Sequence, residues 1–155
     1  MEFIAFKDRY KYQLTETYSL KIGIHPDTNI EVDGYLSLDP NGLLTIKRGY
    51  AWDGPSGPTF DTPNFMRGSL VHDALYQIMR EKKLDREIHR AGADELLRKI
   101  CLEDGMSWLR ASWVHLGVRL FGEPASDPAH KHPTIYAPRK PSDVVSPSET
   151  EIQTN

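Results

Sequence analysis

One short segment combines the residue types of acid–base chemistry with the spacing of a helix. Within residues 70–76, His72, Asp73 and Tyr76 interrupt a run that is otherwise apolar. His72 and Tyr76 lie one helical turn apart on the same flank, whereas Asp73 lies about 100° further round the helix. Burying an ionisable pair beside an apolar core costs desolvation free energy, so partners must hold it there. The pattern predicts either an acid–base site in a cleft beside the core or a structural histidine–aspartate pair.

A second carboxylate, Asp94, stands on the mostly apolar stripe of the next predicted helix. A short turn makes consecutive helices antiparallel, which brings Asp94 back toward His72. We expect the two side chains within hydrogen-bond reach, at about 2.6–3.2 Å or through one water. Such a bond would fix the imidazole tautomer and raise its basicity. The alternative is a salt bridge from Asp94 to Arg67 or Arg98.

The loop that precedes the first helix could supply ligands for a cation. Its candidate binding residues are Trp52, Gly54, Ser56 and Gly57, with Asp53 between them. Glycine allows close backbone approach or positive φ, and loop carbonyls can bind calcium when Asp53 or Asp73 adds charge. Zinc is the weaker alternative because the histidines and aspartates lack a typical ligand spacing. The structural alternative is a tight turn in which Asp53 caps backbone amides.

The elements that position these residues follow from the periodicity of apolar side chains. Residues 10–24 alternate as one long strand, bent near Glu16, and a hairpin with its turn at 39–42 completes a small antiparallel sheet. The period then becomes helical in three segments, 67–81, 85–103 and 107–121. The predicted fold class is therefore α+β, with an N-terminal antiparallel sheet followed by three α-helices.

Prolines and polar residues dominate the chain after Gly122, without any periodicity. Such a composition cannot build a core. We therefore expect a single domain at 1–122 and an extended or disordered proline-rich tail at 123–155, which can lie across a partner.

The overall composition excludes several classes of protein. A length of 155 residues suits one domain with a real core, and a net charge of −3 gives no attraction to nucleic acid. A single cysteine, Cys101, excludes an internal disulfide framework. No N-terminal signal pattern and no bilayer-spanning apolar run is visible, so we expect a protein made in a cytoplasm and lacking a transmembrane segment.

Four ordered motifs resemble a phage and prophage family catalogued as domain of unknown function thirteen fifty-three. They are the Trp-Asp-Gly-Pro-Ser-Gly-Pro loop within 49–58, the Val-His-Asp-Ala-Leu-Tyr segment at 71–76, Ala93-Asp94, and the segment 118–122. The resemblance covers the chain up to Gly122 and implies a bacteriophage origin, often near tail or lysis genes, but no established activity. It implies synthesis in a host cytoplasm, with incorporation into the virion if the protein is structural.

The order of loop, His-Asp-x-x-Tyr helix and second-helix aspartate is also similar to the secreted and parvoviral phospholipases A2. That resemblance implies that His72 is the base, Asp73 a calcium ligand, Asp94 the residue that orients the histidine, and Tyr76 a supporting residue. The chain departs from those enzymes in three ways: it lacks their disulfides, its loop at 52–58 is not their glycine-rich loop, and a sheet precedes the helices.

Two functions are compatible with these features. The first is a metal-assisted hydrolase with a His72 general base, which acts on a lipid ester or a cell-wall bond. The second is a non-catalytic virion component, such as a tail, baseplate or connector protein, which binds other phage structural proteins through residues 123–155. In that case His72, Asp73 and Asp94 would form a buried structural cluster.

Overall fold

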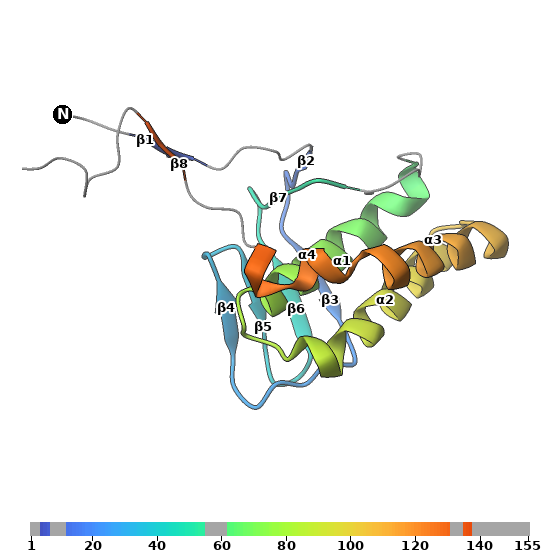
Figure 1. Cartoon of the computed structure of the whole chain (residues 1–155), viewed down its shortest axis with the longest axis horizontal. Helices are drawn as coiled ribbons and strands as arrows, with labels where there is room; N and C mark the ends of the chain where they lie inside the picture. Colours follow the sequence, from blue (N-terminus) through green and yellow to red (C-terminus); the bar gives the residue numbers. More distant parts are fainter. Residues whose placement is uncertain (1–3, 7–11, 55–61, 131–134, 138–155) are drawn as a thin grey trace, which may run out of the picture. The chain divides into compact units, whose positions relative to one another are not determined.

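The computed structural model describes residues 4–6, 12–54, 62–130 and 135–137 (Figure 1). The chain falls into two compact units, one spanning Arg9–Lys131 and the other formed by the two ends of the chain. In the latter unit, β1 (Ile4–Phe6) pairs antiparallel with β8 (Ile135–Ala137). The larger unit carries every described candidate site residue, so the fold that positions the site is that of 9–131.

The core sheet of the larger unit is antiparallel and has the strand order β3-β6-β5-β4. Its strands are β3 (Tyr18–Lys21), β4 (Ile30–Val32), β5 (Leu36–Leu38) and β6 (Leu43–Ile46). Alternate residues of the hairpin, such as Leu36, Leu38, Leu44 and Ile46, are fully or almost fully buried. The period of two therefore places one face of the sheet against the helices.

The alternating segment 10–24 does not form one strand. It contains β2 (Tyr12–Gln13) and β3, with Glu16 in the bend between them. β2 pairs with β7 (Ala51–Trp52), whereas β3 pairs with β6. The predicted bend is confirmed, and its consequence is that β2 holds the start of the candidate binding loop.

The three predicted helices are confirmed as α1 (Pro63–Arg80), α2 (Arg86–Glu103) and α3 (Trp108–Phe121). α1 begins before the apolar period starts, because Pro63 occupies its first turn after Thr62, where proline is well tolerated. Asp85 is the N-cap of α2, and its side chain accepts hydrogen bonds from the backbone N–H groups of Glu87 and Ile88.

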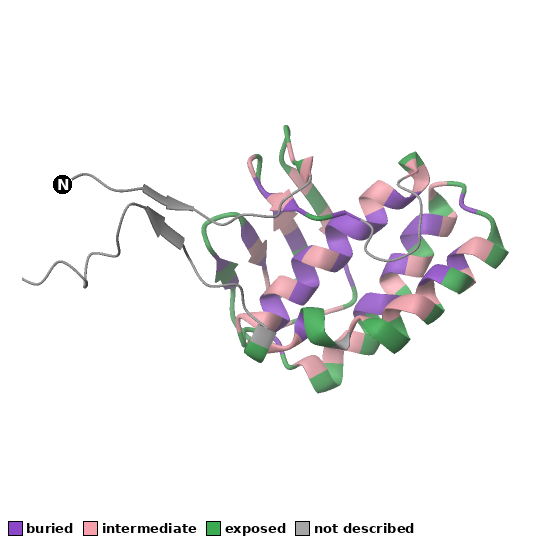
Figure 2. Ribbon diagram, turned by 45° about the horizontal axis from the view of Figure 1, so that its top comes forward, coloured by how far each residue is buried: buried purple, intermediate pink, exposed green. Residues whose placement is uncertain are grey.

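α1 is the central helix of the larger unit. Its buried residues, among them Val71, Leu75 and Ile78, share one apolar cluster with the sheet, and Figure 2 shows α1 as the helix with the most buried surface. A second cluster, which contains Leu97 and Val114, joins α1, α2 and α3. No helix within the described ranges is long and apolar enough to cross a membrane.

The first part of the predicted tail is folded, which corrects the expectation that everything after Gly122 lies outside the domain. α4 (Glu123–Ser126) and a 3₁₀ turn (Pro128–His130) contact α1. Arg80 donates a hydrogen bond of 2.7 Å to the carbonyl of Ala125, and Ser126 is fully buried. Hydrogen bonds and one small side chain anchor this segment, so no apolar period marks it in the sequence.

Candidate functional site

A glycine on α1 allows the two site helices to approach closely. A Cβ atom on Gly68 would lie 2.9 Å from both Cys101 Sγ and Leu97 Cδ1 of α2, which is closer than packed carbon atoms tolerate. One turn further along α1, His72 faces Asp94 on α2. The short contact at Gly68 thus sets the helix separation at which the two polar side chains meet.

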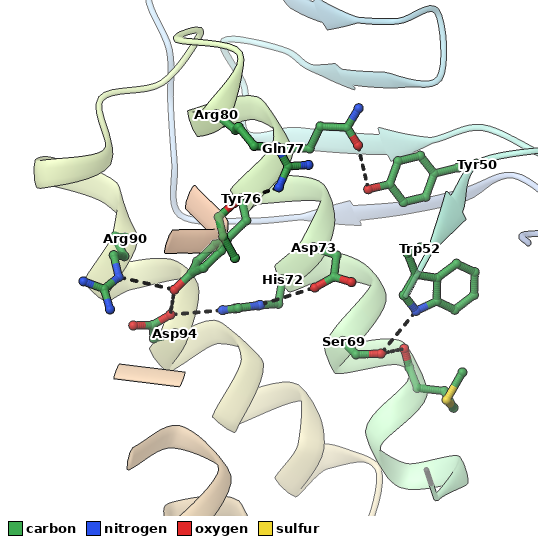
Figure 3. Close-up of polar contacts among 12 residues, drawn as sticks. Tyr50, Trp52, Ser69, His72, Asp73, Tyr76, Gln77, Arg80, Arg90 and Asp94 are labelled. Atoms are coloured by element: carbon green, nitrogen blue, oxygen red, sulfur yellow. Dashed lines mark hydrogen bonds and ion pairs between the residues drawn. The ribbon is translucent and has the colours of Figure 1, made fainter. Parts of the chain in front are cut away.

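The polar centre of the site is a chain of hydrogen bonds between buried side chains (Figure 3). His72 Nε2 lies 3.0 Å from Asp94 Oδ1, which confirms the contact expected from the sequence. The hydroxyl of Tyr76 donates to the same oxygen at 2.7 Å, and the ring centroids of His72 and Tyr76 are 3.9 Å apart. Asp94 and Tyr76 are each 2% exposed, so the carboxylate depends on protein donors in place of water.

The predicted alternative for Asp94 does not occur. Arg67 instead forms a bidentate hydrogen-bonded pair with Asp104 and also contacts Glu103. Arg98 pairs with Glu95, three residues before it on the same helix. The charge of Asp94 is therefore available to the imidazole and the phenol.

Burial and hydrogen bonding shift the pKa values of Asp94 and His72 in opposite directions, and the partners prevail over burial at both residues. Burial raises the pKa of Asp94, but the hydrogen bonds from His72 and Tyr76 outweigh it and hold the pKa below 3.8. Burial lowers the pKa of His72, yet the nearby carboxylates of Asp73 and Asp94 bring it above 6.5. Burial also raises the pKa of Tyr76, and its bond to Asp94 adds to this effect. Asp94 is consequently ionised and Tyr76 neutral at neutral pH.

The ionised state of Asp94 determines the tautomer of neutral His72. A carboxylate can only accept hydrogen bonds, so Nε2 carries the proton that points to Asp94. The lone pair of the neutral ring is then on Nδ1, which lies 3.7 Å from Asp73 Oδ1. That distance exceeds a direct hydrogen bond. The gap between Nδ1 and Asp73 Oδ1 is too narrow to hold a water, so a water that donates a hydrogen bond to Nδ1 would lie beside the pair and not between the two atoms.

Arg90 extends the network to the end of α3. Its Nε donates to the Tyr76 hydroxyl at 3.4 Å, and its Nη2 donates to the carbonyl of Arg119 at 2.8 Å. Gly122 follows α3, where a Cβ atom would lie 3.0 Å from the Tyr76 hydroxyl. The end of α3 is therefore held against the phenol that supports Asp94.

A cavity of about 550 Å³ adjoins the network. His72, Asp73 and Tyr76 contribute to one side, and Trp52, Asp53 and Gly54 contribute to another. Further lining comes from apolar residues of α3, including Trp113, Leu116, Leu120 and Phe121. The cavity thus combines a polar wall that carries the candidate base with an apolar wall of the size suited to a hydrocarbon chain.

Polar contacts fix the strand before the binding loop to α1. Trp52 Nε1 donates to Ser69 Oγ at 3.3 Å, and the hydroxyl of Tyr50 donates to Gln77 Oε1 at 3.0 Å. The sequence prediction did not include Ser69, Gln77 or Arg90. The sequence does contain a signal for Ser69 and Gln77, because polar residues recur along one side of the otherwise apolar helix α1. This polar stripe consists of Ser69, His72, Asp73, Tyr76, Gln77 and Arg80.

The structure brings some of the expected cation ligands to one cavity. Asp73 and Asp53 both line it, and Gly54 has a φ of 75°. Ser56 and Gly57 lie outside the described residues. Within the part of the chain that the structure describes, no three His, Cys, Asp or Glu side chains form a group that could hold a metal ion. A cation here would need backbone carbonyls to complete its coordination, which favours a hard ion such as calcium over zinc.

Comparison with family models, with curated proteins and with solved structures found no match to this chain. The resemblances to the phage family and to phospholipases A2 therefore stay predictions from the motifs.

Proposed function

We propose that the protein is a phage-encoded ester hydrolase in which His72 is the general base. One observation carries the proposal: Nε2 is bound to a buried carboxylate, while Nδ1 belongs to a side chain that lines a cavity large enough for a substrate. A histidine whose far nitrogen is fixed in this way is oriented for proton transfer at the near nitrogen.

In this mechanism Nδ1 of neutral His72 takes a proton from a water molecule as the water oxygen attacks the ester carbonyl carbon. Asp94 stabilises the imidazolium that forms, and Tyr76 keeps the carboxylate in place. The tetrahedral intermediate then expels the alcohol, which receives the proton from Nδ1. The products are a carboxylic acid and an alcohol, and the base is restored to its neutral form.

Asp73, Asp53 and loop carbonyls near Gly54 are the groups that would hold a calcium ion. Such an ion supplies positive charge for the oxyanion of the tetrahedral intermediate. Asp73 suits this role because its side chain is 28% exposed and lines the cavity, with Oδ1 3.7 Å from Nδ1 of His72.

The cavity wall favours a lipid ester over a cell-wall bond. The side chains from α3 are large and apolar, whereas glycan and peptide substrates present many polar groups that such a wall would leave without hydrogen bonds. An acyl chain would instead gain free energy by leaving water.

Hydrolysis of a short-chain phosphatidylcholine, with calcium or with chelator, tests this proposal. We expect His72→Gln to lose about 10²–10⁴-fold in rate, with the matched exposed variant His25→Gln unchanged. Calcium at about 100 times its dissociation constant should stabilise the wild type by about 2.7 kcal/mol, and Asp73→Asn should abolish that gain without lowering metal-free stability. The hydrolase proposal would be refuted by a wild type that neither hydrolyses the ester nor is stabilised by calcium, together with an Asp73→Asn variant that is destabilised.

A non-catalytic virion component is the second candidate, and the exposed apolar residues of α3 favour it. Large exposed apolar patches in soluble proteins usually mark interaction surfaces. Under this function the buried His72–Asp94 pair is structural, and Asp73→Asn costs about 1–3 kcal/mol with or without metal. The partners would be other phage structural proteins, bound through α3 and residues 123–155.

A further inference from the structure

α3 is apolar on two sides. Ala111 and Val114 are buried against the rest of the unit. Six large apolar side chains of the same helix are between 48% and 80% exposed and are here called the α3 face: Trp108, Leu109, Trp113, Leu116, Leu120 and Phe121. The rest of the described chain exposes three side chains of this kind, at separate places: Tyr35 in the turn between β4 and β5, Leu43 on β6 and Ile88 on α2. The concentration on one helix indicates a surface that is covered in use.

From this face we infer that the protein docks onto a lipid surface with anionic headgroups, which delivers substrate to the cavity. The inference rests on the proposed function, because the α3 face and the cavity share residues. Trp113, Leu116 and Phe121 are exposed and also line the cavity that His72 lines. A second copy or another protein seated permanently on this face would obstruct the cavity along α3. A lipid surface would not obstruct the cavity, because lipid molecules from that surface are the proposed substrates that enter it.

The charges of α3 agree with this occupant. Residues 108–121 contain Arg110 and Arg119 but no aspartate or glutamate, although the whole chain has a net charge of −3. Tryptophan, leucine and phenylalanine insert into the boundary between headgroups and acyl chains, while arginines contact lipid phosphates. A helix of net positive charge in a protein of net negative charge thus carries most of the large apolar side chains that the described chain exposes.

Two residues of the face allow docking to be tested without altering the cavity. Trp108 and Leu109 are 63% and 75% exposed and do not line it. The variant Trp108→Ser/Leu109→Ser therefore removes part of the docking surface alone. Ile88→Ser is the matched control, because Ile88 is 70% exposed but lies on α2.

Binding of the full chain to sedimented vesicles, of phosphatidylcholine alone or mixed with phosphatidylglycerol, measures the docking. We expect the wild type to prefer the anionic vesicles, with weaker binding at high salt. The double variant should bind roughly tenfold more weakly or worse, and Ile88→Ser should bind as the wild type does. All three proteins should hydrolyse a monomeric short-chain ester equally well.

Failure of docking and failure of the hydrolase give different results. Vesicle binding that the double variant loses supports the docking surface even if no ester is cleaved, and the proposed activity alone is then wrong. Ester hydrolysis by a protein that does not bind vesicles refutes docking alone. A stable dimer that the double variant dissociates, in a protein without vesicle affinity, assigns the α3 face to a second copy and overturns the inference.

Discussion

Asp94→Asn separates the charge of the buried carboxylate from its shape. The asparagine oxygen can still accept hydrogen bonds from the Tyr76 hydroxyl and from Nε2–H of His72. We therefore expect the variant to fold, while the imidazolium that forms during catalysis loses the negative charge beside it. The perturbation tests whether that charge serves the reaction.

The distance between Nε2 and Oδ1 sets the magnitude. At the observed 3.0 Å, two unit charges attract by about 5.5 kcal/mol at an effective dielectric constant of about 20. A change of this size in the activation free energy corresponds to a factor of about 10⁴ in the rate constant. Both charges are spread over two atoms, and asparagine keeps a neutral hydrogen bond, so the attraction is an upper limit. We expect kcat/KM to fall by about 10²–10⁴-fold.

Hydrolysis of short-chain phosphatidylcholine measures the loss, and circular dichroism establishes that the variant is folded. Glu95→Gln is the matched control, because it removes an exposed carboxylate from the next position of α2. An NMR titration of His72 gives a readout that is independent of activity, and its pKa should fall in Asp94→Asn. A folded variant with wild-type kcat/KM, or with an unchanged His72 pKa, would refute the reasoning.

Three further predictions concern the stability of the larger unit. Gly68→Ala should lower the free energy of unfolding by about 1–2 kcal/mol, although alanine is the better helix former, because its Cβ atom crowds α2; a raised Tm would contradict this. The pKa of His72 is raised, so its contribution to the free energy of unfolding is present below pH 6.5 and is lost as pH rises through the folded pKa. The pKa of Asp94 is lowered, so its contribution to the free energy of unfolding is present above pH 3.8 and is lost in stronger acid. The Tm difference between wild type and Asp94→Asn should thus be largest between pH 3.8 and 6.5, and a difference that does not vary with pH would oppose it. Removing residues 123–155 should lower Tm, since α4 contacts α1, whereas removing 132–155 should lower it less; equal effects would show that α4 adds no stability.

Local patterns were sufficient to predict the helices, the hairpin and the pairing of His72 with Asp94. Helical spacing put each residue on the inner stripe of its helix, and the short connection between α1 and α2 left one direction for the second helix. Asp85 as N-cap is likewise a local property, because a cap bonds to backbone groups two or three residues away.

Other features depend on residues far apart in the chain, and only the tertiary structure decided them. The segment 10–24 divides because β2 and β3 find different partners, and a period of two carries no information about which strand lies alongside. α3 returns to the site because its apolar side packs against α1 and α2, and Arg90 also donates a hydrogen bond to the carbonyl of Arg119. Residues 123–130 contact α1, where Arg80 donates a hydrogen bond to the carbonyl of Ala125. The sequence determined which side chains share a helix face, since that depends on local geometry. The tertiary packing determined which faces meet, and so placed the apolar residues of α3 in the same cavity as the candidate base.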